Sequence, residues 1–170
     1  MEQPSARFEN VCPYTYANLL TLYRKGRPWW VNVLLGVMTV LGLVLVAFTA
    51  SEGQWASCAL MALFAVVYGY YWLAAPIRQA KRRAAQYGPD QPHRETSRFY
   101  EDTYVSGEDG AYLKYNKIYR IIETKELFIL VVKPQLYCLA DKAGFTQGTA
   151  ESFRQFLTER APQAKYRRPR

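Results

Sequence analysis

The uncharged runs WWVNVLLGVMTVLGLVLVAFTA (residues 29–50) and WASCALMALFAVVYGYYWLAA (residues 55–75) dominate this chain of 170 residues. An α-helix rises about 1.5 Å per residue, so about 20 residues span the ~30 Å hydrocarbon core of a bilayer. Both runs reach that length, and Leu, Val and Ala make up most of each. The sequence therefore predicts a transmembrane helical hairpin over residues 29–75. Two buried helices of a globular protein would instead show shorter runs with polar residues at helical spacing.

Aromatic residues stand at the ends of both runs, where a membrane-spanning helix meets the water interface. Two open the first run, one opens the second and three lie near its end. We expect these six residues to be interface anchors: Trp29, Trp30, Trp55, Tyr70, Tyr71 and Trp72.

The net charge of +8 is concentrated beside the hairpin, whereas the loop at residues 51–54 has no Lys or Arg. The positive-inside rule therefore predicts a multi-pass protein of the bacterial cell (inner) membrane with both termini in the cytoplasm. A cleaved signal peptide is not expected, because the first run is too long and a second span follows at once. The flanking cations are candidate contacts for anionic lipid head groups: Arg24, Lys25, Arg27, Arg78, Lys81, Arg82 and Arg83.

The two runs contain no ionisable residue apart from Cys and Tyr, which argues against a transporter or channel. Small residues at helical spacing are available for close helix packing: Gly36, Thr39 and Gly42 in the first run, Ala65 and Gly69 in the second. They indicate packing of the two helices within the hairpin, with a homodimer interface as the alternative.

Outside the hairpin the pattern changes to that of a soluble domain. Its segments are a cytoplasmic N-terminal strand and helix (1–28), a basic juxtamembrane helix and linker (76–97), a sheet domain (98–160) and a basic tail (161–170). Thr15 is a candidate N-cap of the first helix.

Residues 98–106 form an aromatic and β-branched run typical of a strand, and LFILVVK (127–133) is typical of a central strand buried on both faces. Thr149 can cap a helix over residues 150–160, with Phe153, Phe156 and Leu157 on its apolar face. We therefore predict an α+β membrane protein in which one antiparallel sheet of about five strands is closed by a C-terminal helix.

Three stretches, RFYEDTYVS (98–106), YNKIYRIIETKELFILVV (115–132) and LYCLADKAGFTQGTAESFRQFL (136–157), resemble the YcxB-like family of small bacterial membrane proteins. The residues that carry the resemblance are Ile118, Ile121, Glu123, Thr124, Lys142 and Phe145. The resemblance extends over residues 8–160. It implies two adjacent transmembrane helices followed by a cytoplasmic sheet domain similar to small bacterial pleckstrin-homology-like sheets, and it implies no reaction.

The sequence contains no phosphate-binding loop, nucleophile elbow or zinc-protease motif. Its one histidine, His93, follows a proline in the linker, and its three cysteines, Cys12, Cys58 and Cys138, are isolated. Neither a metal site nor a cofactor is predicted. The acidic residues of the sheet domain are interpreted as turn and strand-edge positions, except that Glu123 is a candidate for hydrogen bonding to the sheet.

These observations predict a non-enzymatic integral inner-membrane protein that presents its sheet domain to a protein partner in transport, signalling or toxin immunity. The alternative is a membrane-anchored sensor of anionic lipid head groups. Nucleic acid is not an expected partner, because the tail KYRRPR (165–170) is short and residues 99–160 carry 8 basic and 9 acidic residues.

Overall fold

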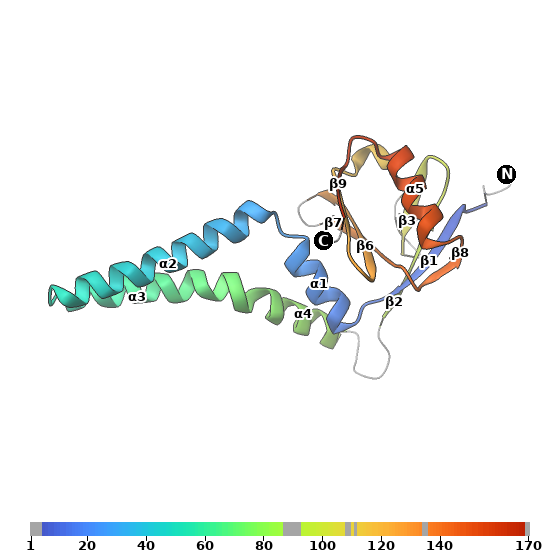
Figure 1. The fold of residues 1–170 in the computed structure, drawn as a ribbon. Helices are drawn as coiled ribbons and strands as arrows, with labels where there is room; N and C mark the ends of the chain where they lie inside the picture. The colour runs from blue at the N-terminus through green and yellow to red at the C-terminus, as the bar shows by residue number, and fades with distance from the viewer. Residues whose placement is uncertain (1–4, 87–92, 108–109, 111, 134–135, 169–170) are drawn as a thin grey trace. The chain divides into compact units, whose positions relative to one another are not determined.

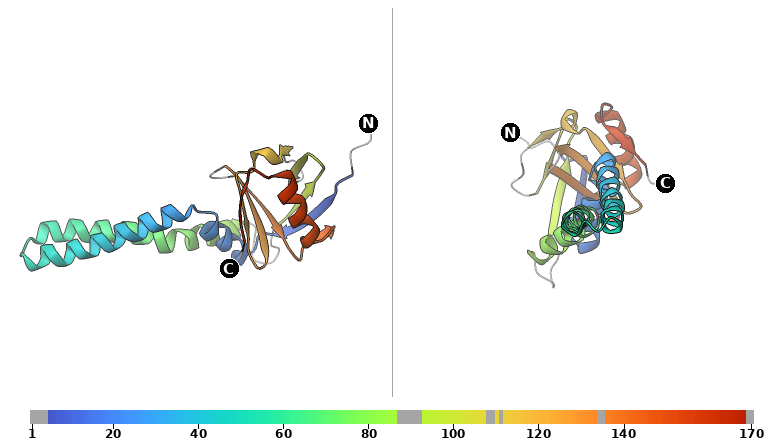
Figure 2. Two further views of the ribbon diagram at one scale, coloured as in Figure 1. Left: turned by 45° about the horizontal axis from the view of Figure 1, so that its top comes forward. Right: turned by 90° about the vertical axis from the view of Figure 1, so that its left-hand side faces the viewer.

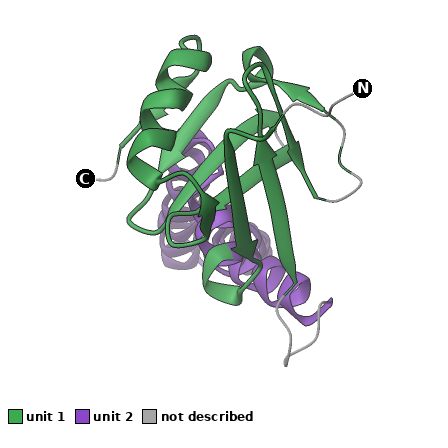
Figure 3. Cartoon of the chain, turned by 90° about the vertical axis from the view of Figure 1, so that its right-hand side faces the viewer, with its two compact units in different colours: residues 1–18, 87–170 green, residues 19–86 purple. Residues whose placement is uncertain are grey.

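The computed structural model describes residues 5–86, 93–107, 110, 112–133 and 136–168. The chain forms two compact units, unit 1 from residues 1–18 and 87–170 and unit 2 from residues 19–86 (Figure 3). The predicted N-terminal strand thus belongs to unit 1 together with the sheet segments. Residues 87–92 of the predicted linker and the last two residues of the predicted tail lie outside the described residues.

Unit 2 is helical, and α2 (Trp29–Ser51) and α3 (Trp55–Gly69) form an antiparallel hairpin (Figures 1 and 2). A π-helical turn, η1 (Tyr70–Ala74), joins α3 to α4 (Ala75–Gln86). Two helices of this unit, residues 29–51 and 55–86, are long and apolar enough to cross a membrane. Ahead of them, α1 (Tyr16–Lys25) begins after Thr15, whose hydroxyl accepts the backbone N–H of Asn18 at 3.2 Å as predicted for an N-cap.

Small residues bring α2 and α3 into close contact. A Cβ atom added to Gly42 would lie 3.0 Å from the Cβ of Ala65 and 3.1 Å from its Cα. A Cβ on Gly69 would lie 3.5 Å from the methyl group of Thr39. The predicted packing of the small residues within the hairpin is therefore seen, and a larger side chain at Gly42 would push against the backbone of the facing helix.

Unit 1 contains two sheets. The first has the order β4-β3-β2-β1-β8 and is antiparallel; its strands are β1 (Phe8–Pro13), β2 (Arg94–Phe99), β3 (Thr103–Ser106), β4 (Leu113–Lys114) and β8 (Phe145–Gln147). The second has the order β7-β6-β5-β9; its strands are β5 (Arg120–Glu123), β6 (Leu127–Lys133), β7 (Leu136–Asp141) and β9 (Lys165–Arg167). Strand β9 pairs parallel to β5, and the other pairings are antiparallel.

The prediction of one sheet of about five strands is therefore wrong. Strand β6 is buried at Leu127–Val132 on both of its faces. On one of them, Phe128, Leu130 and Val132 share a core cluster with residues of α5 and of a second sheet, which includes the N-terminal strand β1. The two sheets are also joined by the buried side chain of Asn10, whose Nδ2 donates to the Asp141 carbonyl at 2.6 Å while its Oδ1 accepts the Asp141 N–H at 2.9 Å.

Residues 98–106 also differ from the prediction, because they do not form one strand. A tight turn at Tyr100–Asp102 separates β2 from β3, with the Tyr100 N–H bonded to the Thr103 carbonyl at 2.8 Å. The Tyr115 hydroxyl, in the 3₁₀ turn η2 (Tyr115–Lys117), donates to the carbonyls of both Tyr100 and Thr103. Aspartate, here Asp102, favours a turn over a continuous strand because its side chain can bond to nearby backbone groups.

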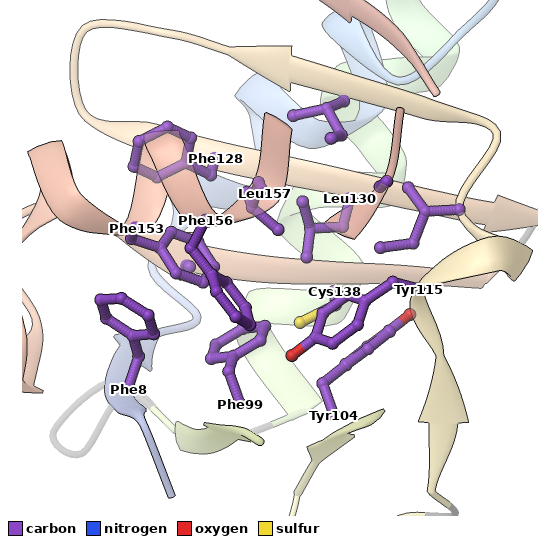
Figure 4. Packing of buried hydrophobic residues seen from close by; sticks show 14 of the residues in the cluster. Phe8, Phe99, Tyr104, Tyr115, Phe128, Leu130, Cys138, Phe153, Phe156 and Leu157 are labelled. Carbon is purple, nitrogen blue, oxygen red and sulfur yellow. The ribbon is translucent and has the colours of Figure 1, made fainter. Parts of the chain in front are cut away.

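Helix α5 (Ala150–Arg160) closes unit 1 and begins as predicted. Thr149 accepts the N–H of Ser152 at 3.2 Å and forms a capping box with it. The predicted apolar face of α5 enters the core, and Figure 4 shows Phe153 and Phe156 among aromatic rings from the strands. The core thus holds the C-terminal helix and both sheets together.

Candidate lipid head-group site

The predicted cations all lie in unit 2, where they outnumber acidic residues seven to one. The one acidic residue of residues 19–86 is Glu52, in the loop of the hairpin. A continuous helix runs from Trp55 to Gln86, so Glu52 and Arg78 are separated by about 35 Å of helix. No carboxylate of unit 2 therefore compensates the charges of Arg78 and Arg82.

Four of the predicted residues come together around a pocket of about 210 Å³ at the start of α4. Its lining residues are Tyr70, Tyr71, Ala75, Arg78, Gln79 and Arg82. The Nη1 atom of Arg78 donates to the Tyr70 hydroxyl at 3.1 Å. Spacings of four, three and four residues place Tyr71, Ala75, Arg78 and Arg82 on one face of the helix.

The backbone beside this pocket is shaped by Pro76. Proline has no N–H and its ring collides with the carbonyl four residues earlier in an α-helix. The π-helical turn η1 ends two residues before Pro76. In the five-residue hydrogen-bond pattern of a π-helix, the missing N–H of Pro76 leaves the Tyr71 carbonyl without its partner. Arg27 supplies one, because its Nη1 donates to that carbonyl at 3.0 Å. The cation before α2 is therefore tied to the π-helical turn η1 through a specific hydrogen bond.

The remaining predicted residues lie apart from the pocket. Lys81 and Arg83 are exposed on α4 but do not line it, and Arg24 and Lys25 are in the last turn of α1. The predicted anchors at the helix starts are strongly exposed: Trp29 at 67%, Trp30 at 57% and Trp55 at 72%. Trp72 instead lies against Gly36.

Two lining residues, Ala75 and Gln79, were not predicted. Tyr71, Ala75 and Gln79 follow one another at intervals of four residues, which places them on one face of a helix. A prediction that continued the helix through Pro76 could therefore have included Ala75 and Gln79. Chemically the pocket combines guanidinium groups, phenol hydroxyls and an amide, which are donors suited to phosphate or carboxylate oxygens.

A second polar cluster lies inside unit 1 around Glu123. Its carboxylate, at the end of β5, accepts hydrogen bonds from Arg154 Nη2 and Lys142 Nζ, each at 2.6 Å, and from the Tyr166 hydroxyl at 2.8 Å. Burial alone would raise the pKa of Glu123, but the hydrogen bonds from Arg154, Lys142 and Tyr166 lower it to about 2. The carboxylate is thus ionised and saturated at neutral pH, which makes it unsuitable as a proton acceptor.

This cluster ties three elements to β5, namely α5, the turn after β7 and strand β9. Glu123 was predicted to bond to the sheet, and its actual partners are side chains. The predicted basic tail was not expected to contain a strand, yet Tyr166 in β9 is half-buried against the core. The alternation Lys-Tyr-Arg is too short to signal that strand from the sequence.

The sequence of this unit agrees with a known family. Residues 99–157 match the YcxB-like protein family. The matched segment starts at the last residue of β2 and contains strands β3 to β8 and most of α5, including Glu123, Lys142 and Arg154. The predicted resemblance is therefore confirmed for this segment. No curated protein and no solved structure matches the chain.

Both thiols of unit 1 are buried. Cys138 lies within the YcxB-like segment, and Cys12 lies in strand β1. Burial raises the pKa of Cys12 to about 12 and that of Cys138 to about 11. Cys138 Sγ lies 3.5 Å from the Ser97 hydroxyl, and all three cysteines are free. Such protonated, enclosed thiols are poor nucleophiles. His93, predicted in the linker, directly precedes β2 and packs against Tyr14 at 5.6 Å between ring centroids.

Proposed function

We propose that this chain is a non-enzymatic integral membrane protein that presents its YcxB-like unit to a protein partner in the cytoplasm. The observation that carries the membrane location is the exposure of the hairpin. Only 6% and 11% of the most apolar windows of its two helices are buried. Water in contact with that much continuous apolar surface is unfavourable, and the hydrocarbon of a bilayer removes the cost.

The orientation follows from the charges that flank the hairpin. Seven cations lie before α2 and on α4, and the loop between α2 and α3 has none. The positive-inside rule favours the cell membrane with both termini and unit 1 on the cytoplasmic side.

Thiol labelling in whole cells tests this orientation. With Cys58 replaced by serine, we expect Ser51→Cys, at the end of α2 beside the loop, to react with an impermeant maleimide. Ser5→Cys, exposed in unit 1, should react only after the cells are permeabilised. The native Cys138 is a poor reporter because it is 2% exposed and would be silent on either side. The reverse pattern of labelling would contradict the orientation.

Binding is the proposed role of unit 1 because its buried carboxylate and its two buried thiols are poorly suited to acid–base or nucleophilic chemistry. Glu123 is saturated by three donors, and burial keeps Cys12 and Cys138 protonated. The two sheets and the C-terminal helix support a pleckstrin-homology-like fold, which we propose as the scaffold for the partner. We place that partner among the membrane or cytoplasmic proteins of transport, signalling or toxin-immunity systems.

Purification from native membranes tests the protein partner. The tagged full chain in mild detergent is expected to retain one protein in a constant molar ratio, read by quantitative mass spectrometry. A tagged hairpin of residues 19–86 is the matched control and is expected to lose that protein, since unit 1 is absent. Equal retention by the hairpin alone would refute presentation by unit 1.

Recognition of anionic lipid head groups is the second candidate function. The pocket of unit 2 favours it, because Arg78 and Arg82 lie beside phenol hydroxyls without a carboxylate of their own unit. Cations near an anionic membrane surface each contribute about 1 kcal/mol to binding. The homodimer named above as an alternative is compatible with a protein partner and with a lipid partner.

A further inference from the structure

We propose that the pocket formed by Tyr70, Tyr71, Ala75, Arg78, Gln79 and Arg82 binds the phosphate group of an anionic phospholipid. This assignment rests on the membrane location proposed above. It differs from the general attraction of basic residues to a membrane surface, because only Arg78 and Arg82 of the four cations on α4 take part. The Tyr71 hydroxyl and the Gln79 amide add two neutral donors.

The electrostatics of the pocket call for an anion. Arg78 and Arg82 are four residues apart on one helix face, so their like charges repel each other. The acidic residue of unit 2, Glu52, lies at the far end of the hairpin. Arg78 donates to the Tyr70 hydroxyl, a neutral acceptor that an ionised phosphate oxygen outcompetes, since hydrogen bonds to charged acceptors are about twice as strong.

The size and lining of the pocket suit a phosphodiester. Its volume of about 210 Å³ exceeds the ~30 Å³ that one water molecule occupies several-fold. Arginine presents a planar fork of donors that matches two phosphate oxygens. The Gln79 amide and the Tyr71 hydroxyl supply further donors around the same space.

The place of the pocket along the helix favours a lipid over a soluble phosphate. It begins near the end of the apolar run, at the aromatic pair Tyr70–Tyr71, and aromatic residues of this kind lie at the depth of lipid head groups. Apolar side chains of α3 lead directly away from it, and Val66 is 68% exposed and Leu63 60% exposed. A phosphate held by the arginines would therefore leave the acyl chains along α3.

Lipid titration of the full chain in neutral detergent, read by native mass spectrometry, tests the assignment. Phosphatidylglycerol is compared with phosphatidylcholine of the same acyl chains. The double variant Arg78→Gln/Arg82→Gln is matched by Lys81→Gln/Arg83→Gln, which removes the same charge from the same helix outside the pocket. We expect the pocket variant to lose about tenfold or more of the affinity for phosphatidylglycerol and the matched variant less than about threefold. Equal losses would overturn the proposal.

Two further measurements in the same titration test the role of a hydroxyl group and the identity of the ligand. Tyr71→Phe changes no charge, and we expect a loss of about two- to tenfold, as for one hydrogen bond; unchanged affinity would overturn the direct role of the hydroxyl. Inorganic phosphate at millimolar concentration is not expected to displace the lipid, and full displacement would assign the pocket to a soluble phosphate instead.

The membrane location is tested separately by extraction of native membranes at alkaline pH. Release of the wild-type chain would refute the location itself. Retention of the chain without a preference for phosphatidylglycerol would refute only the pocket.

Discussion

Replacing Glu123 with glutamine is expected to destabilise unit 1 by roughly 3 kcal/mol. Its side chain is 3% exposed, and those of Lys142 and Arg154 are 19% and 28% exposed. Removing one member of a buried ion pair leaves the other charge without compensation, which costs about 3–5 kcal/mol. Lowering the pKa of Glu123 from its ordinary value of 4.5 to about 2 corresponds to a similar figure, roughly 3 kcal/mol. The partly exposed cations place the expected loss at the lower end.

The measurement needs a reporter inside unit 1, because all four tryptophans lie in unit 2. Cys138 is buried in the core of unit 1 and becomes reactive on unfolding. Its alkylation across a urea series, with the full chain in mild detergent, gives the free energy of unfolding of this unit. Glu151→Gln is the matched control, since Glu151 also pairs with Arg154 but is 79% exposed. We expect a change within about 0.5 kcal/mol for the control; an equal loss in both variants would show that burial of Glu123 is not the cause.

The same cluster predicts how the stability of unit 1 depends on pH. Because the pKa of Glu123 is lower in the folded state than in the unfolded state, the carboxylate contributes its full stabilisation above about pH 5. That contribution is lost as the pH falls from about 5 towards 2. Unfolding of the wild-type chain at pH 6, 4 and 3 should show this loss. In Glu123→Gln the part of the dependence that comes from this carboxylate is expected to be absent.

The parts of the structure that could be predicted are those encoded locally. An uncharged apolar run predicts its helix because every residue of the run contributes the same signal, and α2 lies within one residue of the expected bounds. Thr149 predicts its cap because the hydroxyl needs only the N–H of Ser152, three residues on. The α2–α3 packing is similar, because the small residues of both helices repeat at helical spacing.

The parts that could not be predicted depend on residues far apart in the chain. Strand β1 pairs with β2 across more than 80 residues, for example Phe8 with Phe99, and no local pattern states which strands become neighbours. Tyr166 lies in a strand of three residues that is held by Glu123, 43 positions away. The candidate pocket was predicted in part: its arginines and tyrosines follow from charge and interface patterns, whereas Gln79 becomes a lining residue through the helix geometry around Pro76.

The ring of Phe153 occupies the centre of the core of unit 1, and Phe153→Ala is expected to cost about 3–5 kcal/mol. The ring is fully buried and meets Phe8 of β1, Phe99 of β2 and Phe128 of β6 at centroid distances of 5.3, 4.6 and 5.4 Å. These strands belong to both sheets, so truncation opens a cavity that neither sheet can fill without moving away from the other.

Urea unfolding followed by Cys138 alkylation measures the loss in Phe153→Ala, and Tyr112→Ala is the control. Tyr112 is an aromatic residue of the same unit that is 63% exposed, so its removal is expected to change the free energy of unfolding by less than about 0.5 kcal/mol. Phe153→Leu keeps most of the apolar volume and should lie between the two. The fluorescence of the tryptophans in unit 2 is expected to be unchanged in Phe153→Ala, because the hairpin is held by its own contacts between α2 and α3. A loss below about 1 kcal/mol in Phe153→Ala would contradict the central role of this ring, because full burial of an aromatic side chain contributes more than that.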